Sequence, residues 1–144
     1  MSVRSRLRGD RGAVSLELAI LGPALLLVLS FAIWAGRTQI ADNAVQEAAR
    51  SAAREASIAL DAGTATSLAT FQAQTTLAEQ NLKCESVSVQ VDTSGFAAPL
   101  GVSGDVTVTV SCTIGMADLL APGLPGSVEV EASFTSPVDA YRER

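Results

Sequence analysis

The chain has 144 residues, of which 48% are hydrophobic, 17% are charged and none is histidine. This length predicts one domain with accessory segments, and the hydrophobic content argues against a disordered chain and favours a membrane segment. The lack of histidine excludes Ser-His-Asp and Cys-His catalysis and every histidine-ligated metal site.

Charge is divided unevenly along the chain. Residues 1–12 carry four arginines and one aspartate, a net charge of +3, whereas residues 37–144 carry six Lys or Arg and thirteen Asp or Glu, a net charge of −7. An acidic globular part lacks the basic face that nucleic-acid binding requires, so we expect no nucleic-acid partner.

An uncharged run of nineteen residues extends from Leu18 to Gly36. As a helix it would span about 28 Å, close to the hydrocarbon thickness of a bilayer. Trp34 falls where an interfacial aromatic side chain is expected, and Arg37 ends the run. The arginines before the run place residues 1–12 in the cytoplasm by the positive-inside rule. We therefore predict a basic cytoplasmic leader over 1–12, a transmembrane helix over 13–36 and an extracytoplasmic remainder. A cleaved secretory signal peptide is the alternative, although its apolar core is usually shorter.

Two features interrupt this apolar segment. Glu17 places a carboxylate at its edge, where a charge is either functional or reaches the cytoplasmic interface. Pro23 follows Gly22, removes a backbone donor and clashes with the carbonyl of Ala19. We predict a helix kink or a short unwound turn at residues 19–23.

The helical pattern continues past the membrane to about residue 60. Small apolar residues recur there at helical spacing and predict a packing face over the extension 37–63. The stretch 62–67 is interpreted as a break. A second helix, over about 65–82, is predicted with Leu68, Phe71, Thr75, Ala78 and Leu82 on one face.

Beyond this helix the apolar period changes to two. Valines alternate with Ser, Thr or Glu in three stretches, around Val87–Val91, Val106–Val110 and Val128–Phe134, which predicts three strands with one buried face each. The region 64–144 is therefore predicted as an α+β ectodomain, in which a small three-stranded antiparallel sheet packs on the long helix and the second short helix. Glu129 and Glu131 share the polar face of one strand and are interpreted as solvated. We found no catalytic constellation, and expect no enzyme activity, no cofactor and no small-molecule substrate.

Cys84 and Cys112 are the only cysteines. An even count outside the cytoplasm predicts a disulfide, which would stabilise the fold by about 3–4 kcal/mol in the chain-entropy model. If Val87 pairs with Val110, Cys84 falls opposite Thr113, on the wrong face of its strand. The bond therefore requires Cys84 to lie in the helix–strand turn or at a bulge. Two buried thiols are the alternative, and we expect no metal site.

The residues Arg11 to Glu17, RGAVSLE, resemble a type IV prepilin processing site. The following stretch, Arg37 to Arg54, is similar to the TadE-like minor pseudopilins of the tight-adherence (Tad/Flp) pilus system, as are Pro122–Gly126 and Ser136–Tyr141. The resemblance implies cleavage by prepilin peptidase between Gly12 and Ala13, with Glu17 as the fifth residue of the mature chain. Leu18 is a departure, because many pilins of this system carry an aromatic residue there.

The resemblance further implies a role in pilus assembly rather than catalysis. Glu17 would pair with the new amine of Ala13 on a neighbouring subunit and set the register. The implied partners are prepilin peptidase, other Tad pilus subunits, assembly-platform proteins and the lipid bilayer. The implied location is the bacterial cell membrane, as a single-pass protein that also enters a pilus. Two alternatives stay open, which are a membrane-anchored extracytoplasmic binding module without leader processing and a small secreted enzyme.

Overall fold

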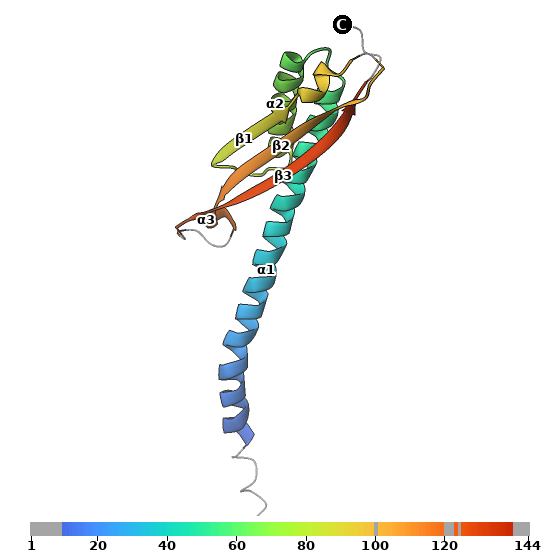
Figure 1. Ribbon diagram of the computed structural model, residues 1–144. Coiled ribbons are helices and arrows are strands. Elements are labelled where there is room, and N and C mark those ends of the chain that lie inside the picture. The colour runs from blue at the N-terminus through green and yellow to red at the C-terminus, as the bar shows by residue number, and fades with distance from the viewer. Residues whose placement is uncertain (1–9, 100, 120–122, 124, 140–144) are drawn as a thin grey trace, which may run out of the picture. The chain divides into compact units, whose positions relative to one another are not determined.

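The computed structural model describes residues 10–99, 101–119, 123 and 125–139, with side chains from Glu17 onward (Figure 1). The chain divides into two compact units, residues 1–36 and residues 37–144. The described part contains a long helix, a second helix and a three-stranded antiparallel sheet, so the predicted α+β class is confirmed.

The first helix, α1, extends over Asp10–Ser57. In the second unit its inner face is almost entirely alanine, and eight of its side chains are at most 4% exposed, namely Ala41, Ala44, Val45, Ala48, Ala49, Ala52, Ala53 and Ala56. The predicted packing face is therefore confirmed. Alanine has the highest helix propensity and the smallest side chain after glycine, so this face supports a long helix and allows close approach of its neighbours.

The second helix, α2, extends over Ala62–Glu79 and begins earlier than predicted. The carboxylate of Asp61 accepts hydrogen bonds from the backbone N–H of Thr64 at 2.9 Å and from its hydroxyl at 2.7 Å. This N-cap satisfies backbone donors that would otherwise be unpaired, which explains why the stretch 62–67 is helical rather than a break.

The face predicted for α2 is only partly buried, because Leu68 and Leu82 pack against the core whereas Phe71 and Ala78 do not. The buried residues are Ala65, Ala69, Ala73, Thr76 and Leu77, whereas Phe71 is 68% exposed and Ala78 is also exposed. Small side chains let α2 lie close to the alanine face of α1, and a phenylalanine in that interface would hold the two helices apart. Close packing of alanines thus outweighs the burial of one aromatic ring.

The end of α2 is a Schellman motif. Asn81 has a φ of 55°, its N–H donates to the carbonyl of Ala78, and the N–H of Leu82 donates to the carbonyl of Leu77. Asparagine tolerates this left-handed conformation better than most residues. The motif ends the helix and turns the chain toward the sheet.

The sheet has the order β1-β2-β3 and is antiparallel throughout. Its strands are β1 over Ser86–Asp92, β2 over Gly104–Gly115 and β3 over Ser127–Val138, with a 3₁₀ turn η1 over Ser94–Ala97 and a short helix α3 over Met116–Leu119. The trial register was wrong by two residues, because Val87 lies opposite Cys112 and Val89 opposite Val110. A shift of two leaves every side chain on its predicted face.

The two faces of the sheet differ sharply. On β2 the valines from Val106 to Val110 are fully buried, together with Cys112. On the opposite face, hydroxyl groups pair across the strands, with Thr107 to Thr135 at 2.8 Å and Thr109 to Ser133 at 3.0 Å. The alternation of valine with serine or threonine therefore separates a buried core face from a polar outer face.

Candidate functional site: the processing and assembly segment

The predicted cleavage site lies at the start of α1. Gly12 and Ala13 are within the bounds of this helix, which begins at Asp10. Their side chains, and the predicted leader arginines Arg4, Arg6, Arg8 and Arg11, lie outside the side chains that the structure describes.

Glu17 is the first residue whose side chain is described, and it is exposed. It directly precedes ten large apolar side chains that are each at least half exposed, which are Leu18, Ile20, Leu21, Leu25, Leu26, Leu27, Val28, Leu29, Phe31 and Ile33. Such an apolar surface on a helix is suited to lipid or to the helices of other proteins. Glu17 therefore places one acceptor group at the border of an apolar contact surface.

The helix continues through Pro23. The predicted unwound turn is thus not formed, and the kink stays a prediction. Gly22 leaves an indentation beside the proline, because a Cβ at this position would meet no atom within 4 Å. This apolar groove has a volume of about 430 Å³ and is lined by Leu18, Leu21, Gly22, Ala24, Leu25 and Val28.

The two polar side chains Ser30 and Trp34 in the apolar run differ in their hydrogen bonding. The hydroxyl of Ser30 donates to the carbonyl of Leu26 at 2.7 Å, which satisfies it inside its own helix. The ring of Trp34 lies 5.6 Å from that of Phe31, and its buried Nε1 has no hydrogen-bond partner among the described residues. By length and composition, α1 qualifies as a membrane-spanning helix.

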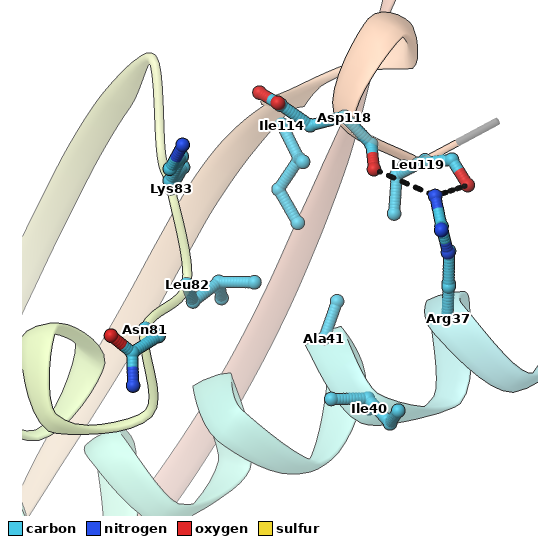
Figure 2. A pocket seen from close by; sticks show the side chains of 9 residues that line it. All are labelled: Arg37, Ile40, Ala41, Asn81, Leu82, Lys83, Ile114, Asp118 and Leu119. Carbon is cyan, nitrogen blue, oxygen red and sulfur yellow. Dashed lines mark hydrogen bonds between the residues drawn. The ribbon is translucent and has the colours of Figure 1, made fainter. Parts of the chain in front are cut away.

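Arg37 does more than end the apolar run. Its Nη1 donates to the carbonyls of Asp118 and Leu119, at 3.4 Å each, and so ties the start of the second unit to α3 (Figure 2). Sequence reasoning missed this role because nothing local relates residues more than eighty positions apart. Two neighbouring carbonyls at the end of a short helix are natural acceptors for a guanidinium group.

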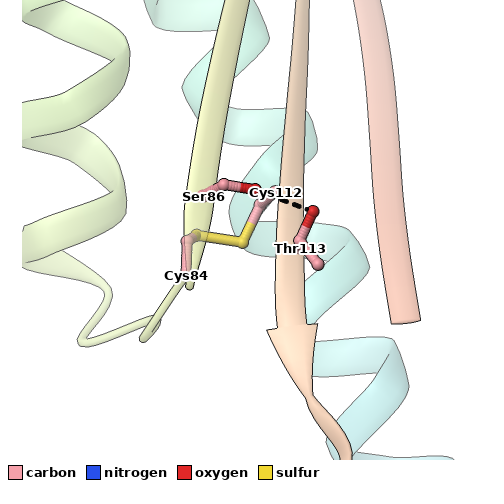
Figure 3. Close-up of a disulfide and its surroundings, with 4 residues drawn as sticks. All are labelled: Cys84, Ser86, Cys112 and Thr113. Atoms are coloured by element: carbon pink, nitrogen blue, oxygen red, sulfur yellow. Dashed lines mark hydrogen bonds between the residues drawn. A yellow bond between two sulfur atoms is a disulfide. The ribbon is translucent and has the colours of Figure 1, made fainter. Parts of the chain in front are cut away.

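The predicted disulfide between Cys84 and Cys112 is formed, with a Cα–Cα distance of 5.4 Å (Figure 3). Cys84 lies in the turn before β1, as the bond required. The neighbouring pair, Ser86 and Thr113, is joined by a hydrogen bond of 3.0 Å between hydroxyls. The disulfide therefore fixes the end of the α2–β1 connection to the central strand.

Carboxylates on the sheet do not form a site. Glu129 and Glu131 are both exposed on β3, in agreement with their interpretation as a solvated face. Among the described residues no group of three or more His, Cys, Asp or Glu side chains is placed to hold a metal ion.

These features define a class of protein, in which one apolar helix able to cross a membrane leads into an α+β unit held by a disulfide. Residues 12–54 match the family model of the TadE-like proteins, so the resemblance found in the sequence is confirmed for this segment. The match includes Gly12, Ala13 and Glu17. No curated protein and no solved structure matches the chain.

Proposed function

We propose that this protein is a minor pilin or pseudopilin that takes part in assembling a tight-adherence pilus, with a structural or assembly-priming role. The observation that carries the proposal is the TadE-like match over residues 12–54. The matched segment holds the G-x4-E element, the apolar run and the alanine-faced helix in one continuous stretch.

The proposed placement in the membrane is single-pass, with the N-terminus in the cytoplasm. The four arginines of residues 1–12 favour this direction, and the run Leu18–Gly36 has the length to cross the bilayer. The disulfide supports an extracytoplasmic location for the domain, because such bonds persist outside the reducing cytoplasm.

Processing would occur between Gly12 and Ala13 through prepilin peptidase. Glycine has no side chain and allows a protease to approach the backbone closely. Cleavage would remove the four leader arginines and expose an α-amine on Ala13. The amine and the carboxylate of Glu17 are complementary charges, so pairing between neighbouring subunits would favour one register among apolar helices.

In α1, most apolar side chains are buried within the second unit and exposed before it, which supports contacts with other subunits through the N-terminal part of this helix. In the second unit the alanine face of α1 is already buried within the domain, with Ala48, Ala49 and Ala52 at 0% exposure. The apolar groove at Gly22 and the exposed leucines around it are still available to other subunits and to the assembly platform.

The test is the intact mass and N-terminal sequence of the protein from its native membrane, compared for Gly12→Val and Gly9→Val. We expect a wild-type chain that starts at Ala13, loss of processing in Gly12→Val and normal processing in Gly9→Val. A start at Met1 in all three would favour the unprocessed membrane-anchored module instead, and a soluble form that begins near Gly36 would favour a secreted protein.

A further inference from the structure

A pocket of about 320 Å³ lies at one end of the second unit, outside the processing segment (Figure 2). Its walls come from the start of the second unit's part of α1, the α2–β1 connection, the end of β2 and α3. The side chains that matter here are Arg37, Ile40, Leu82, Lys83, Ile114 and Leu119. The volume is at the lower end of the range of ligand sites, about 300–1,000 Å³.

The pocket combines an apolar floor with a cationic rim. Ile114 and Leu119 are 2% and 5% exposed, whereas Ile40, which also lines the pocket, is 66% exposed. Of the four Lys and Arg residues described between residues 37 and 139, two line this pocket. This concentration is unusual because the surrounding unit is acidic, so an anionic group with an apolar attachment is the ligand chemistry that fits.

The rim is open to such a group. Arg37 uses only Nη1 for its long contacts with α3, and a guanidinium has five N–H donors in all. Lys83 is exposed. Asp118 supplies the one carboxylate among the lining residues, and Figure 2 shows that carboxylate pointing away from Arg37.

The position of Arg37 in α1, directly after the apolar run, indicates a membrane lipid as the source of the anion. Arg37 directly follows the apolar run, and Ala41 lies five residues beyond Gly36, about 7.5 Å along a helix. The headgroup layer on each side of a bilayer is about 5–7 Å thick. If Leu18–Gly36 spans the membrane, Arg37 is the first residue beyond the apolar run, and its guanidinium is expected near the lipid phosphates.

We propose that this pocket binds the headgroup of an anionic phospholipid from the outer surface of the membrane. The phosphodiester would lie between Arg37 and Lys83, and the glycerol and upper acyl carbons would contact Ile40 and Leu82. The inference goes beyond pilus assembly and rests on the proposed membrane placement.

The test uses the full-length, disulfide-bonded chain in nanodiscs of phosphatidylcholine with about 30% phosphatidylglycerol, a content chosen to give a marked negative surface potential. After transfer to mild detergent, native mass spectrometry counts the lipids that stay bound. We expect selective retention of phosphatidylglycerol, reduced about fivefold by Lys83→Gln. Arg54→Gln, which removes an equal charge from an exposed position on α1 outside the pocket, should leave retention unchanged.

Several results would overturn the proposal. Equal retention of the two lipids, or equal loss in Lys83→Gln and Arg54→Gln, would indicate general attraction rather than a site. Displacement of the lipid by millimolar inorganic phosphate would indicate a free-anion site, and a lipid-free dimer would indicate a second copy in the pocket. A chain that stays outside the nanodiscs would contradict the membrane placement itself, which is distinguishable from insertion without selectivity. Arg37→Gln is a second variant, with intact disulfide and circular dichroism as its folding control.

Discussion

The hydroxyls of Ser51 on α1 and Thr76 on α2 lie 2.9 Å apart, and most of the buried side chains of these two helices are alanine. Thr76 is 6% exposed, so its hydroxyl has little access to water. The hydrogen bond between the two hydroxyls forms only when Ser51 and Thr76 face each other, so it favours one alignment of α1 with α2.

Replacing Thr76 with valine should lower the free energy of unfolding by about 1 kcal/mol, because it leaves the Ser51 hydroxyl without this partner. Adding Ser51→Ala should recover part of the loss. Thr66→Ala, whose exposed hydroxyl bonds only the carbonyl of Ala62, is the control. Chemical denaturation of the wild type, of Thr76→Val and Ser51→Ala alone, of the double variant and of the Thr66→Ala control gives the coupling energy. Additive effects of the two single variants would contradict the coupling.

Helix α2 offers a matched pair that tests close packing. Ala73→Leu should destabilise the fold by about 1–3 kcal/mol, because Ala73 is 0% exposed and a larger side chain would have to displace its buried neighbours. Ala78→Leu in the same helix is exposed and should change stability by no more than about 0.5 kcal/mol. Thermal unfolding measures the melting temperatures of the two variants, and we expect that of Ala73→Leu to be the lower. Similar melting temperatures would mean that the interface is loosely packed.

The disulfide should contribute substantially to the stability of the second unit. Cys84→Ser with Cys112→Ser is expected to lower the free energy of unfolding by about 3–4 kcal/mol, since the bond closes a long loop of the unfolded chain. Reductant should lower the melting temperature of the wild type and leave that of the double variant unchanged. A double variant as stable as the oxidised wild type would contradict this contribution.

The cap of α2 predicts a pH dependence. The hydrogen bond from the backbone N–H of Thr64, followed by that from its hydroxyl, lowers the pKa of Asp61 below its usual value. A depressed pKa in the folded state stabilises the fold above the unfolded pKa, and this stability is lost as pH falls through the folded pKa. Asp61→Asn should therefore reduce the acid dependence of the melting temperature below about pH 4. Identical acid profiles would show that the cap carries no ionic contribution.

Glu17 provides the sharpest test of register. If the carboxylate of Glu17 pairs with the amine of Ala13 on a neighbouring subunit, Glu17→Ala would leave that amine as an unpaired charge among apolar helices. We therefore expect incorporation of the variant into the pilus machinery to fall at least about tenfold. Glu47→Ala, an exposed acidic position on the part of α1 beyond the apolar run, is the control. The measurement is the amount of the chain in purified pili and assembly complexes. Incorporation of Glu17→Ala at the wild-type level would contradict the register role.

Patterns that depend on local sequence were predictable. The period-two valines fix both the strands and the face that each side chain occupies, and the alanine spacing identifies the buried side of α1. The disulfide followed from cysteine count and the predicted compartment, and its geometry required Cys84 to lie before the strand, where the structure has it.

Features that depend on tertiary contact were not predictable. The buried face of α2 is chosen by the alanines of α1, against the hydrophobicity of Phe71. The strand register is set by packing along the sheet, and the bond from Arg37 to the carbonyls of α3 joins distant parts of the sequence. In each case the deciding partner is far away in the chain, so local periodicity carries no information about it.

The exposed apolar side chains between Leu18 and Ile33 limit the states that the protein can occupy. Leaving one such side chain in water rather than burying it costs about 1.5–3 kcal/mol, so ten of them together exceed the stability of a typical domain. A free subunit dissolved in water is therefore not an accessible intermediate. If the helix lies in a bilayer as proposed, a departure from the bilayer would be a direct transfer, in which each lipid contact is replaced by a protein contact before water reaches the helix.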